Sequence, residues 1–363
     1  MVYVGSFTSA GGRGITTAAV DPLTEALTLL SSTDALADPS YLAVDRGTGL
    51  LYAVSEAEQG AAGAFRPTPE GLTALGPAVR VGGSGPTHLS VAGRRLLTAN
   101  YTSGSVSSLP LAADGRLSGP AAVLVHRGSG PHPSRQERPH AHQVLPDPSG
   151  RWVLSVDLGT DSVRVCAVDP ATGSLRLHGE TALRAGTGPR HLAFHPAGEL
   201  LYVVHELEPQ LTVCRWHPGT GRVEAGAEVP IGSDGGSAPV RSAGSAEGGT
   251  AGGAEGGAEG VRAYPSALVA SPDGRFVWAA VRGADVILTF SLADGPERPR
   301  LTSVVACGGS WPRDLAADPA GRRLYAANER SGDVCWFDVD PLTGRPRPAG
   351  SVAVPAASCV VFA

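Results

Sequence analysis

One pattern recurs along this chain, and its repetition limits the possible fold more than any other feature. A typical copy has a Pro-x-x-apolar start, an alternating run, an Asp/Pro/Gly turn and a second run with an aromatic residue. Short alternating runs bounded by turn residues indicate β-strands. The six complete copies occupy residues 39–56, 86–101, 141–157, 189–206, 265–282 and 312–329.

The two ends of the chain supply a seventh copy. Residues 358–363 resemble the first run of the pattern and residues 2–7 resemble the second. The apolar anchors of the first runs recur at intervals of 47, 55, 48, 76, 47 and 45 residues: Leu42, Leu89, Val144, Leu192, Leu268, Leu315 and Val360. Repeats of this length have room for four short strands and are typical of propeller blades. We therefore predict one all-β domain over residues 1–363, a seven-bladed β-propeller of four-stranded antiparallel blades, closed by the N- and C-terminal strands.

The composition excludes several classes of partner. A net charge of −5 without a basic stripe argues against binding to nucleic acid or anionic membrane. No apolar run approaches the roughly 20 residues that span a bilayer, and the N-terminus lacks the pattern of a secretory signal. Nothing in the sequence indicates the oligomeric state. The five cysteines are odd in number and widely spaced, which is typical of buried thiols in a reducing compartment, so we expect a cytoplasmic protein.

The longest interval between copies contains a low-complexity segment at residues 232–260. It consists mainly of Gly, Ala, Ser and Glu, which cannot bury a core, so we expect a disordered insert between two blades. A lid over a site is the alternative, but the segment has no aromatic or basic anchor.

The interval of 55 residues is lengthened by a loop that is rich in ionisable groups. Polar loops that lead into rigid strands often carry binding and catalytic groups, whereas the alternative here is a solvated surface loop. The ionisable residues of this stretch are His126, Arg127, His132, Arg135, Glu137, Arg138, His140 and His142.

Alignment of the copies brings further ionisable residues to the same place. In an antiparallel blade, the first strand begins and the second strand ends at the same face. The residues two positions before the anchors are Ser40, Thr87, His142, Arg190, Ser266, Arg313 and Ser358. The second runs end at Phe7, Glu56, Tyr101, Asp157, Glu206, Arg282 and Glu329. Both sets are expected around one mouth of the central channel, where a purely structural propeller could have small polar residues instead.

Four residues of this predicted ring suit a reaction on an anionic ester or lactone: His142, Arg190, Glu206 and Arg282. Arginine binds carboxylate or phosphate bidentately and can stabilise the oxyanion formed when a carbonyl is attacked. Histidine can give and take a proton near neutrality. Glu206 could orient water, hold His142 or fix an arginine, and the structural alternative is a salt bridge between Glu206 and Arg282.

A metal site is an alternative to this arrangement. His140 and His142 form an H-x-H pair that Asp157 and Glu206 could complete, but the arginines would repel a cation, so we expect no metal and no cofactor. The sequence has no G-x-S-x-G, H-E-x-x-H or P-loop motif. We expect His191, His195 and His205 to pack within blades or turns. The aromatic residues that share one slot of the repeat are expected in the core: Tyr52, Tyr202, Trp278 and Tyr325.

Several segments carry a resemblance to a known family. They are YVGSFT (3–8), RQERPHAHQ (135–143), DLGTD (157–161), GPRHLAFHP (188–196), LYVVHE (201–206), SPDGRF (271–276) and the Arg282-Gly283 pair. The chain resembles the seven-bladed propeller lactonases, which include bacterial 6-phosphogluconolactonases and fungal carboxymuconate cyclases. By motif, the family's active-site His, Arg, Glu and Arg fall on His142, Arg190, Glu206 and Arg282. Bacterial members tend to have an acidic residue where this chain has Ala267, and an asparagine where it has Val281. Both departures bear on the substrate.

The resemblance implies hydrolysis of a small anionic sugar lactone, namely 6-phosphogluconolactone of the pentose phosphate pathway. We expect His142 to activate water, Arg190 and Arg282 to hold the anionic group and the oxyanion, and Glu206 to position the base or the water. A cycloisomerase that forms a lactone, or a propeller that only binds proteins, are the alternatives. The residues expected to bind substrate are Arg135, Gln136, His140, Asp157, Arg313 and Glu329.

Overall fold

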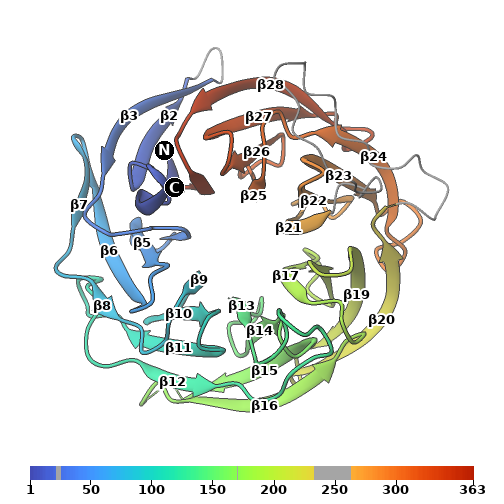
Figure 1. Ribbon diagram of the computed structural model, residues 1–363, viewed down its shortest axis with the longest axis horizontal. Coiled ribbons are helices and arrows are strands. Elements are labelled where there is room, and N and C mark those ends of the chain that lie inside the picture. Colours follow the sequence, from blue (N-terminus) through green and yellow to red (C-terminus); the bar gives the residue numbers. More distant parts are fainter. Residues whose placement is uncertain (22–25, 170, 233–262) are drawn as a thin grey trace, which may run out of the picture.

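Seven antiparallel sheets surround a central channel, and each sheet runs outward from it (Figure 1). The computed structural model describes residues 1–21, 26–169, 171–232 and 263–363. We number the sheets as blades 1 to 7 in chain order, with blade 1 containing both termini. The predicted all-β, seven-bladed propeller is confirmed.

Each blade contributes one strand to each of four successive layers. The innermost strands of blades 1 to 7 are β29 (Ala357–Phe362), β4 (Leu42–Asp45), β9 (Pro86–Ala92), β13 (Ala141–Pro146), β17 (Pro189–Phe194), β21 (Tyr264–Ala270) and β25 (Pro312–Ala317). The second strands are β1 (Val2–Ser6), β5 (Leu50–Ser55), β10 (Arg95–Asn100), β14 (Val153–Asp157), β18 (Leu200–His205), β22 (Phe276–Arg282) and β26 (Arg323–Asn328).

The outer two layers follow in the same order. The third strands are β2 (Ile15–Val20), β6 (Ala61–Thr68), β11 (Ser105–Pro110), β15 (Ser162–Val168), β19 (Gln210–His217), β23 (Val286–Ser291) and β27 (Asp333–Val339). The outermost are β3 (Leu27–Thr33), β7 (Gly71–Ala74), β12 (Ala122–Val125), β16 (Leu175–Ala182), β20 (Arg222–Pro230), β24 (Arg300–Ala306) and β28 (Pro346–Ala353). In blade 2 the short strand β8 (Val79–Arg80) also pairs with β6, and a 3₁₀ helix, η1 (Thr8–Ala10), follows β1.

The sequence of each layer matches its exposure. Strands β5, β18 and β22 are buried along their whole length between neighbouring blades, and each reads as a nearly continuous apolar run. The outermost strand β24 instead alternates between exposed and partly buried residues, because only one of its faces packs on the protein. The core therefore lies between blades, as in the cluster that joins Leu154 of blade 4 to Leu201 and Trp216 of blade 5.

The repeated aromatic slot fastens three of the blades to the next one. Tyr52, Tyr202, Trp278 and Tyr325 are at most 1% exposed, which confirms their predicted place in the core. Three of them also donate a hydrogen bond of 2.8 Å to a carbonyl in an outer loop of the following blade: Tyr52 to Gly115, Tyr202 to Pro296, and Trp278 to Gly344. A buried aromatic ring thus supplies apolar contact area and one directed bond between sheets.

Strands from the two ends of the chain close the ring in blade 1. Strand β29 pairs antiparallel with β1, with Val4 opposite Val360. The termini consequently lie side by side (Figure 1), and the amide of Ala363 donates to the carbonyl of Met1 over 3.1 Å. The predicted closure by both termini is confirmed, and it pairs the inner edge of β1.

Other expectations bear on thiols, membrane and insert. All five cysteines are buried and unpaired with one another, as predicted. None of the helices in the described ranges is long and apolar enough to cross a bilayer. Apart from Gly232, the expected disordered insert at 232–260 lies outside the described residues.

Candidate active site

β-Bulges at the start of the innermost strands direct side chains into one mouth of the channel. In blade 4, Ala141 pairs with Asp157 and Gln143 with Val156, so His142 is the extra residue. Arg190 and Arg313 are the extra residues at the same point of blades 5 and 7. A bulge leaves one residue outside the ladder and turns its side chain toward a new direction. The repeat thereby brings residues that are distant in sequence to a single rim.

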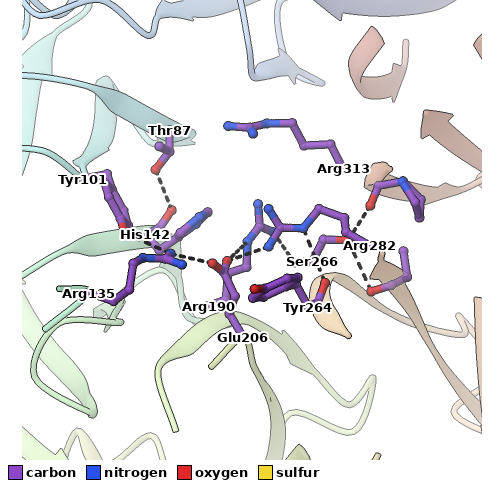
Figure 2. Close-up of polar contacts among 12 residues, drawn as sticks. Thr87, Tyr101, Arg135, His142, Arg190, Glu206, Tyr264, Ser266, Arg282 and Arg313 are labelled. Carbon is purple, nitrogen blue, oxygen red and sulfur yellow. Dashed lines mark hydrogen bonds and ion pairs between the residues drawn. The ribbon is translucent and has the colours of Figure 1, made fainter. Parts of the chain in front are cut away.

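One carboxylate lies at the centre of the charged groups of this rim (Figure 2). Glu206 follows β18 and is 4% exposed. Its Oε1 accepts a hydrogen bond of 2.5 Å from Nη2 of Arg135, and its Oε2 accepts one of 2.6 Å from Nη2 of Arg282. The Nε of Arg190 lies 3.0 Å from the same Oε2. Three guanidinium groups from three different segments thus share one carboxylate.

The charges around Glu206 keep its carboxyl ionised. Burial alone raises the pKa of the Glu206 carboxyl, but the charges of the surrounding arginines outweigh it and hold that pKa far below its usual value. Burial, followed by repulsion from Arg282, lowers the pKa of Arg190 to about 9. One carboxylate against three guanidiniums leaves two positive charges, so the cluster is suited to bind an anion.

A fourth arginine lies across the mouth and is paired with two glutamates. Arg313 donates to both oxygens of Glu56 at 3.1 and 3.2 Å and to Glu329 at 3.2 Å. Its guanidinium lies 4.8 Å from the centre of the Phe7 ring. These contacts hold Arg313 between blades 7, 1 and 2, opposite the Glu206 cluster in Figure 2.

The histidine of the ring lies beside the arginines and is 6% exposed. The ring of His142 packs edge-on against those of Tyr101 and His191, with centroids 5.6 and 5.4 Å apart. Its Nδ1 is buried without a hydrogen-bond partner among the described residues. Burial, and then the charges of nearby arginines, lower the pKa of this imidazole well below 6.5, so it is neutral at pH 7. A neutral imidazole next to guanidiniums retains a lone pair that can accept a proton.

The loop before β13 supplies one wall of the site. Besides its bond to Glu206, Arg135 donates to the Tyr101 hydroxyl over 3.2 Å, and about a third of its side chain is exposed. His140 stacks on Tyr101 with centroids 4.4 Å apart, and its Nδ1 lies 3.0 Å from the Tyr101 carbonyl oxygen. Arg135 and His140 therefore lie at the mouth, as expected.

Two predicted substrate-binding residues are placed differently. Asp157 and Gln136 are both fully buried. Asp157 accepts bonds from the amides of His140 and Gly159 at 2.8 and 3.0 Å, and His126 Nδ1 lies 2.6 Å from its Oδ2. Neither has a surface for substrate, so the prediction of direct contact is wrong for both.

The repeat alignment placed Asp157 one residue off. Asp157 pairs with Ala141 as Asn100 pairs with Pro86, so it is equivalent to Asn100 and not to Tyr101.

The buried glutamine closes the same loop on itself. Gln136 donates to the carbonyl of Leu158 over 2.8 Å and accepts from the amide of His132 over 3.1 Å. Gln136 and Asp157 together fix the loop that carries Arg135 at the rim.

Other histidines are divided between channel and blades. His195 contacts the Gly274 carbonyl at 3.2 Å, and His205 lies 2.8 Å from the hydroxyls of Thr187 and Thr212, as expected of packing residues. His191 differs, because its ring contacts those of His88 and His142 inside the channel.

The alternative metal site does not assemble within the described part of the chain. No three His, Cys, Asp or Glu side chains there are close enough to hold an ion together. Asp157 is bonded to His126 and backbone amides, and Glu206 to arginines.

Sequence reasoning missed one contributor to the mouth, Tyr264, and the backbone contact made by another, Ser266. Tyr264 begins β21 and its carbonyl lies 3.4 Å from Arg282 Nε, while Arg190 donates to the carbonyl of Ser266. Both contacts are made through backbone atoms, which the residue type does not indicate. Ser266 was assigned to the ring by its repeat position, whereas nothing pointed to Tyr264.

Comparison with known proteins places the chain in a family. The model of the family "Lactonase, 7-bladed beta-propeller" matches residues 1–362. A 6-phosphogluconolactonase of Bacillus subtilis is 32% identical over 366 residues, which cover 99% of this chain and 97% of that protein.

Solved structures agree with this match. The periplasmic gluconolactonase of Pseudomonas aeruginosa is 29% identical with a TM-score of 0.85, covering 99% of this chain and 98% of that one. A Bacteroides fragilis protein, described as a candidate 6-phosphogluconolactonase, is 26% identical with a TM-score of 0.86, covering 100% and 97%. The chain therefore belongs to the seven-bladed β-propeller lactonase family.

Proposed function

We propose that this protein hydrolyses 6-phosphogluconolactone to 6-phosphogluconate. Membership of the family makes it an enzyme of the lactonase class, and the substrate and the residue roles are the proposal. The observation that carries it is the group of three arginines around Glu206 beside the neutral imidazole of His142. Such a site offers an anion receptor and a proton acceptor together.

The reaction needs a base that is unprotonated before the substrate arrives. His142 takes a proton from water while the water oxygen bonds to the lactone carbonyl carbon, which forms a tetrahedral oxyanion. The carbonyl then re-forms as the ring C–O bond breaks, and the protonated imidazole returns its proton to the leaving hydroxyl. An anion bound by the arginines offsets the charge that depresses the pKa of His142, and so strengthens the base when substrate is present.

The arginines take two parts in this proposal. Arg190 and Arg282 approach the same oxygen of Glu206, so two guanidinium groups lie side by side at the mouth, and in this proposal they bind the phosphate and stabilise the oxyanion. Both oxygens of Glu206 face guanidiniums, which supports a role in holding the arginines rather than in activating water. Arg135, His140, Arg313 and Glu329 line the rim around the substrate.

The Glu206 cluster and the groups around Arg313 favour a phosphorylated lactone over a neutral one. Four arginines and three glutamates leave one net positive charge at the mouth before substrate binds. A neutral gluconolactone would leave that charge without a partner, whereas a phosphate would offset it.

The same four arginines also suit a substrate with several carboxylates. This observation favours a lactone-forming cycloisomerase as the second candidate. Ring closure of a carboxylated muconate, followed by its ultraviolet absorbance, would distinguish that activity from lactone hydrolysis.

We place the proposed reaction in the cytoplasm, in the pentose phosphate pathway. Five buried free thiols fit a reducing compartment. Assay of 6-phosphogluconolactone clearance in extracts of cells with and without the protein, after fractionation, tests both statements.

His142→Ala tests the proposal directly. Loss of the base should lower kcat for 6-phosphogluconolactone by about 10²- to 10⁴-fold with an unchanged melting temperature. The rate is measured as acid release from a panel of phosphorylated and plain lactones. His217→Ala is the matched control, because His217 lies on the outer strand β19 and its imidazole contacts the exposed Glu224.

Two results would contradict the proposal. An unchanged rate for His142→Ala would remove the imidazole from the mechanism. Preference of the wild type for the plain lactone would remove phosphate as the recognised group.

A further inference from the structure

One position of the repeat precedes the bulged residue by two and lies at the same mouth in every blade. In five blades its backbone is left-handed: Asp38 (φ 45°), Gly85 (57°), Gly188 (61°), Trp311 (65°) and Ala356 (52°). Glycine adopts this conformation freely, whereas a bulky residue in it is an outlier. Trp311 is by far the largest of the five side chains. It also precedes Pro312, which restricts its backbone further.

The surrounding backbone makes the same hydrogen bonds in blade 7 as in blade 5, which has glycine at this position. The amide of Trp311 donates to Oδ1 of Asp285 over 2.8 Å, as the amide of Gly188 donates to Asp161 over 2.8 Å. The carbonyl of Trp311 accepts from the amide of Glu329, as that of Gly188 accepts from Glu206. Glycine can therefore occupy this position with the same two backbone hydrogen bonds, and the indole is not needed to form them.

The indole lies beside the anion receptor. The guanidinium of Arg282, which binds Glu206, is 5.5 Å from the centre of the Trp311 ring. Tyr264 is 6.1 Å away, and the guanidinium of Arg330 stacks at 3.5 Å. Trp311 is partly exposed, whereas the other tryptophans are buried: Trp152, Trp216, Trp278 and Trp336. Strain retained at a cleft is a feature of functional sites.

We propose that Trp311 is a specificity-determining residue whose indole packs against the carbon skeleton of the bound lactone beside Arg282, whose guanidinium lies over the same ring. This inference rests on the proposed function for the identity of the ligand. Aromatic walls next to a few charged groups are typical of small-molecule sites. The apolar face of a sugar ring complements an indole, and the phosphate would lie beyond it on the arginines.

Trp311→Gly separates the role of the side chain from that of the fold. Glycine relieves the left-handed backbone, so the melting temperature should fall by no more than about 2 °C. KM for 6-phosphogluconolactone should rise about tenfold, with kcat changed less than about threefold, because the lost contact is made in the ground state and the transition state alike. Trp311→Phe, which keeps an aromatic face, should restore most of the affinity.

Ala356→Gly is the matched control. Ala356 has the same left-handed backbone in blade 1, but its side chain is apolar and buried, so its replacement should leave KM and kcat unchanged. An equal rise in KM for both glycine variants would show a backbone effect and overturn the inference.

Fluorescence supplies a readout that does not depend on turnover. Titration with 6-phosphogluconate should change the indole emission of the wild type and not that of Trp311→Phe, because the four remaining tryptophans are buried in the blades. No change in the wild type, or a KM of Trp311→Gly within twofold of wild type, would overturn the inference. If the wild type hydrolyses no lactone but still shows the Trp311-dependent emission change, the proposed reaction fails while the binding wall stands.

Discussion

At the scale of single residues, Glu206 and the arginines around it depend on one another. An isolated buried carboxylate would be protonated, and three neighbouring buried guanidiniums would repel one another. Here the cost of burial and the gain from pairing offset each other. The side chains of Arg190 and Arg282, which contact Oε2, are only 3% and 8% exposed. Removing one member therefore leaves uncompensated charge, which is more destabilising than the pair itself is stabilising.

Glu206→Gln should lower the free energy of unfolding at pH 7 by about 3 kcal/mol. The folded-state pKa of Glu206 lies below that of the unfolded chain, so the unfolded state binds the extra proton and stability falls as pH decreases below about 5. The glutamine variant lacks this pH-dependent contribution, so the difference in unfolding free energy between wild type and variant should become smaller as pH falls. Urea unfolding at several pH values measures it.

The exposed pair of Glu224 and Arg222 provides the control. Their side chains are 55% and 65% exposed, so Glu224→Gln should change stability by less than about 0.5 kcal/mol. A gap in unfolding free energy between wild type and Glu206→Gln that stays constant from pH 7 to pH 3 would show that the fold does not lower the pKa of Glu206.

At the scale of elements, bulges and braces bring the site together. The bulge at the start of β13 turns His142 into the mouth, and the loop before it is held from behind by Asp157. Burial raises the pKa of Asp157, but the hydrogen bond from His126 outweighs burial and the pKa is lowered overall. The carboxylate therefore stays ionised and accepts three bonds. Asp157 does not contact the substrate, but its hydrogen bonds hold the loop that sets the position of Arg135.

Asp157→Ala should lower stability by about 3 kcal/mol, because three buried donors lose their acceptor. It should also raise KM, since the loop that carries Arg135 loses its anchor, and proteolysis within residues 126–140 should become faster. Limited proteolysis, urea unfolding and steady-state kinetics measure these effects.

Asp169→Ala is the control for this brace. Asp169 likewise accepts bonds from two amides and a hydroxyl, but it lies on an exposed turn, so the variant should match the wild type in stability and KM. A stable Asp157→Ala protein with normal KM would show that the loop holds its shape by other contacts.

At the scale of the whole molecule, seven sheets form one rim because the chain closes on itself. Strand β29 contributes buried residues at Ala357, Cys359 and Val360 and pairs with β1 along its length. Without it, blade 1 would present the inner edge of β1 to solvent, and the ring would lose one of its walls.

Deletion of residues 357–363 should therefore abolish cooperative unfolding and promote association, even though the catalytic candidates remain in the chain. Deletion of Ala363 alone removes a single terminal residue and should leave the melting curve unchanged. Size-exclusion chromatography and thermal melting compare the two. Activity and a sharp transition in the longer deletion would show that packing between blades closes the ring without the C-terminal strand.

How much of the site was predictable differs from residue to residue. The positions of His142, Arg190 and Arg313 at one mouth followed from the repeat, because equal spacing from an apolar anchor places equivalent residues on the same rim. The position of Asp157 did not. Asp157 pairs with Ala141 as His205 pairs with Pro189, so the residue equivalent to Glu206 is the apolar Leu158, which residue type alone does not single out.

The sequence by itself determined the seven blades, their closure and the face on which the ionisable side chains gather, because strand period and repeat length are local properties. Only the tertiary structure decided that Glu206 faces three guanidiniums, that Asp157 lies behind the loop, and that Trp311 occupies a left-handed position. These features depend on distances between side chains of different blades and on backbone angles at their junctions, which no spacing along the chain encodes.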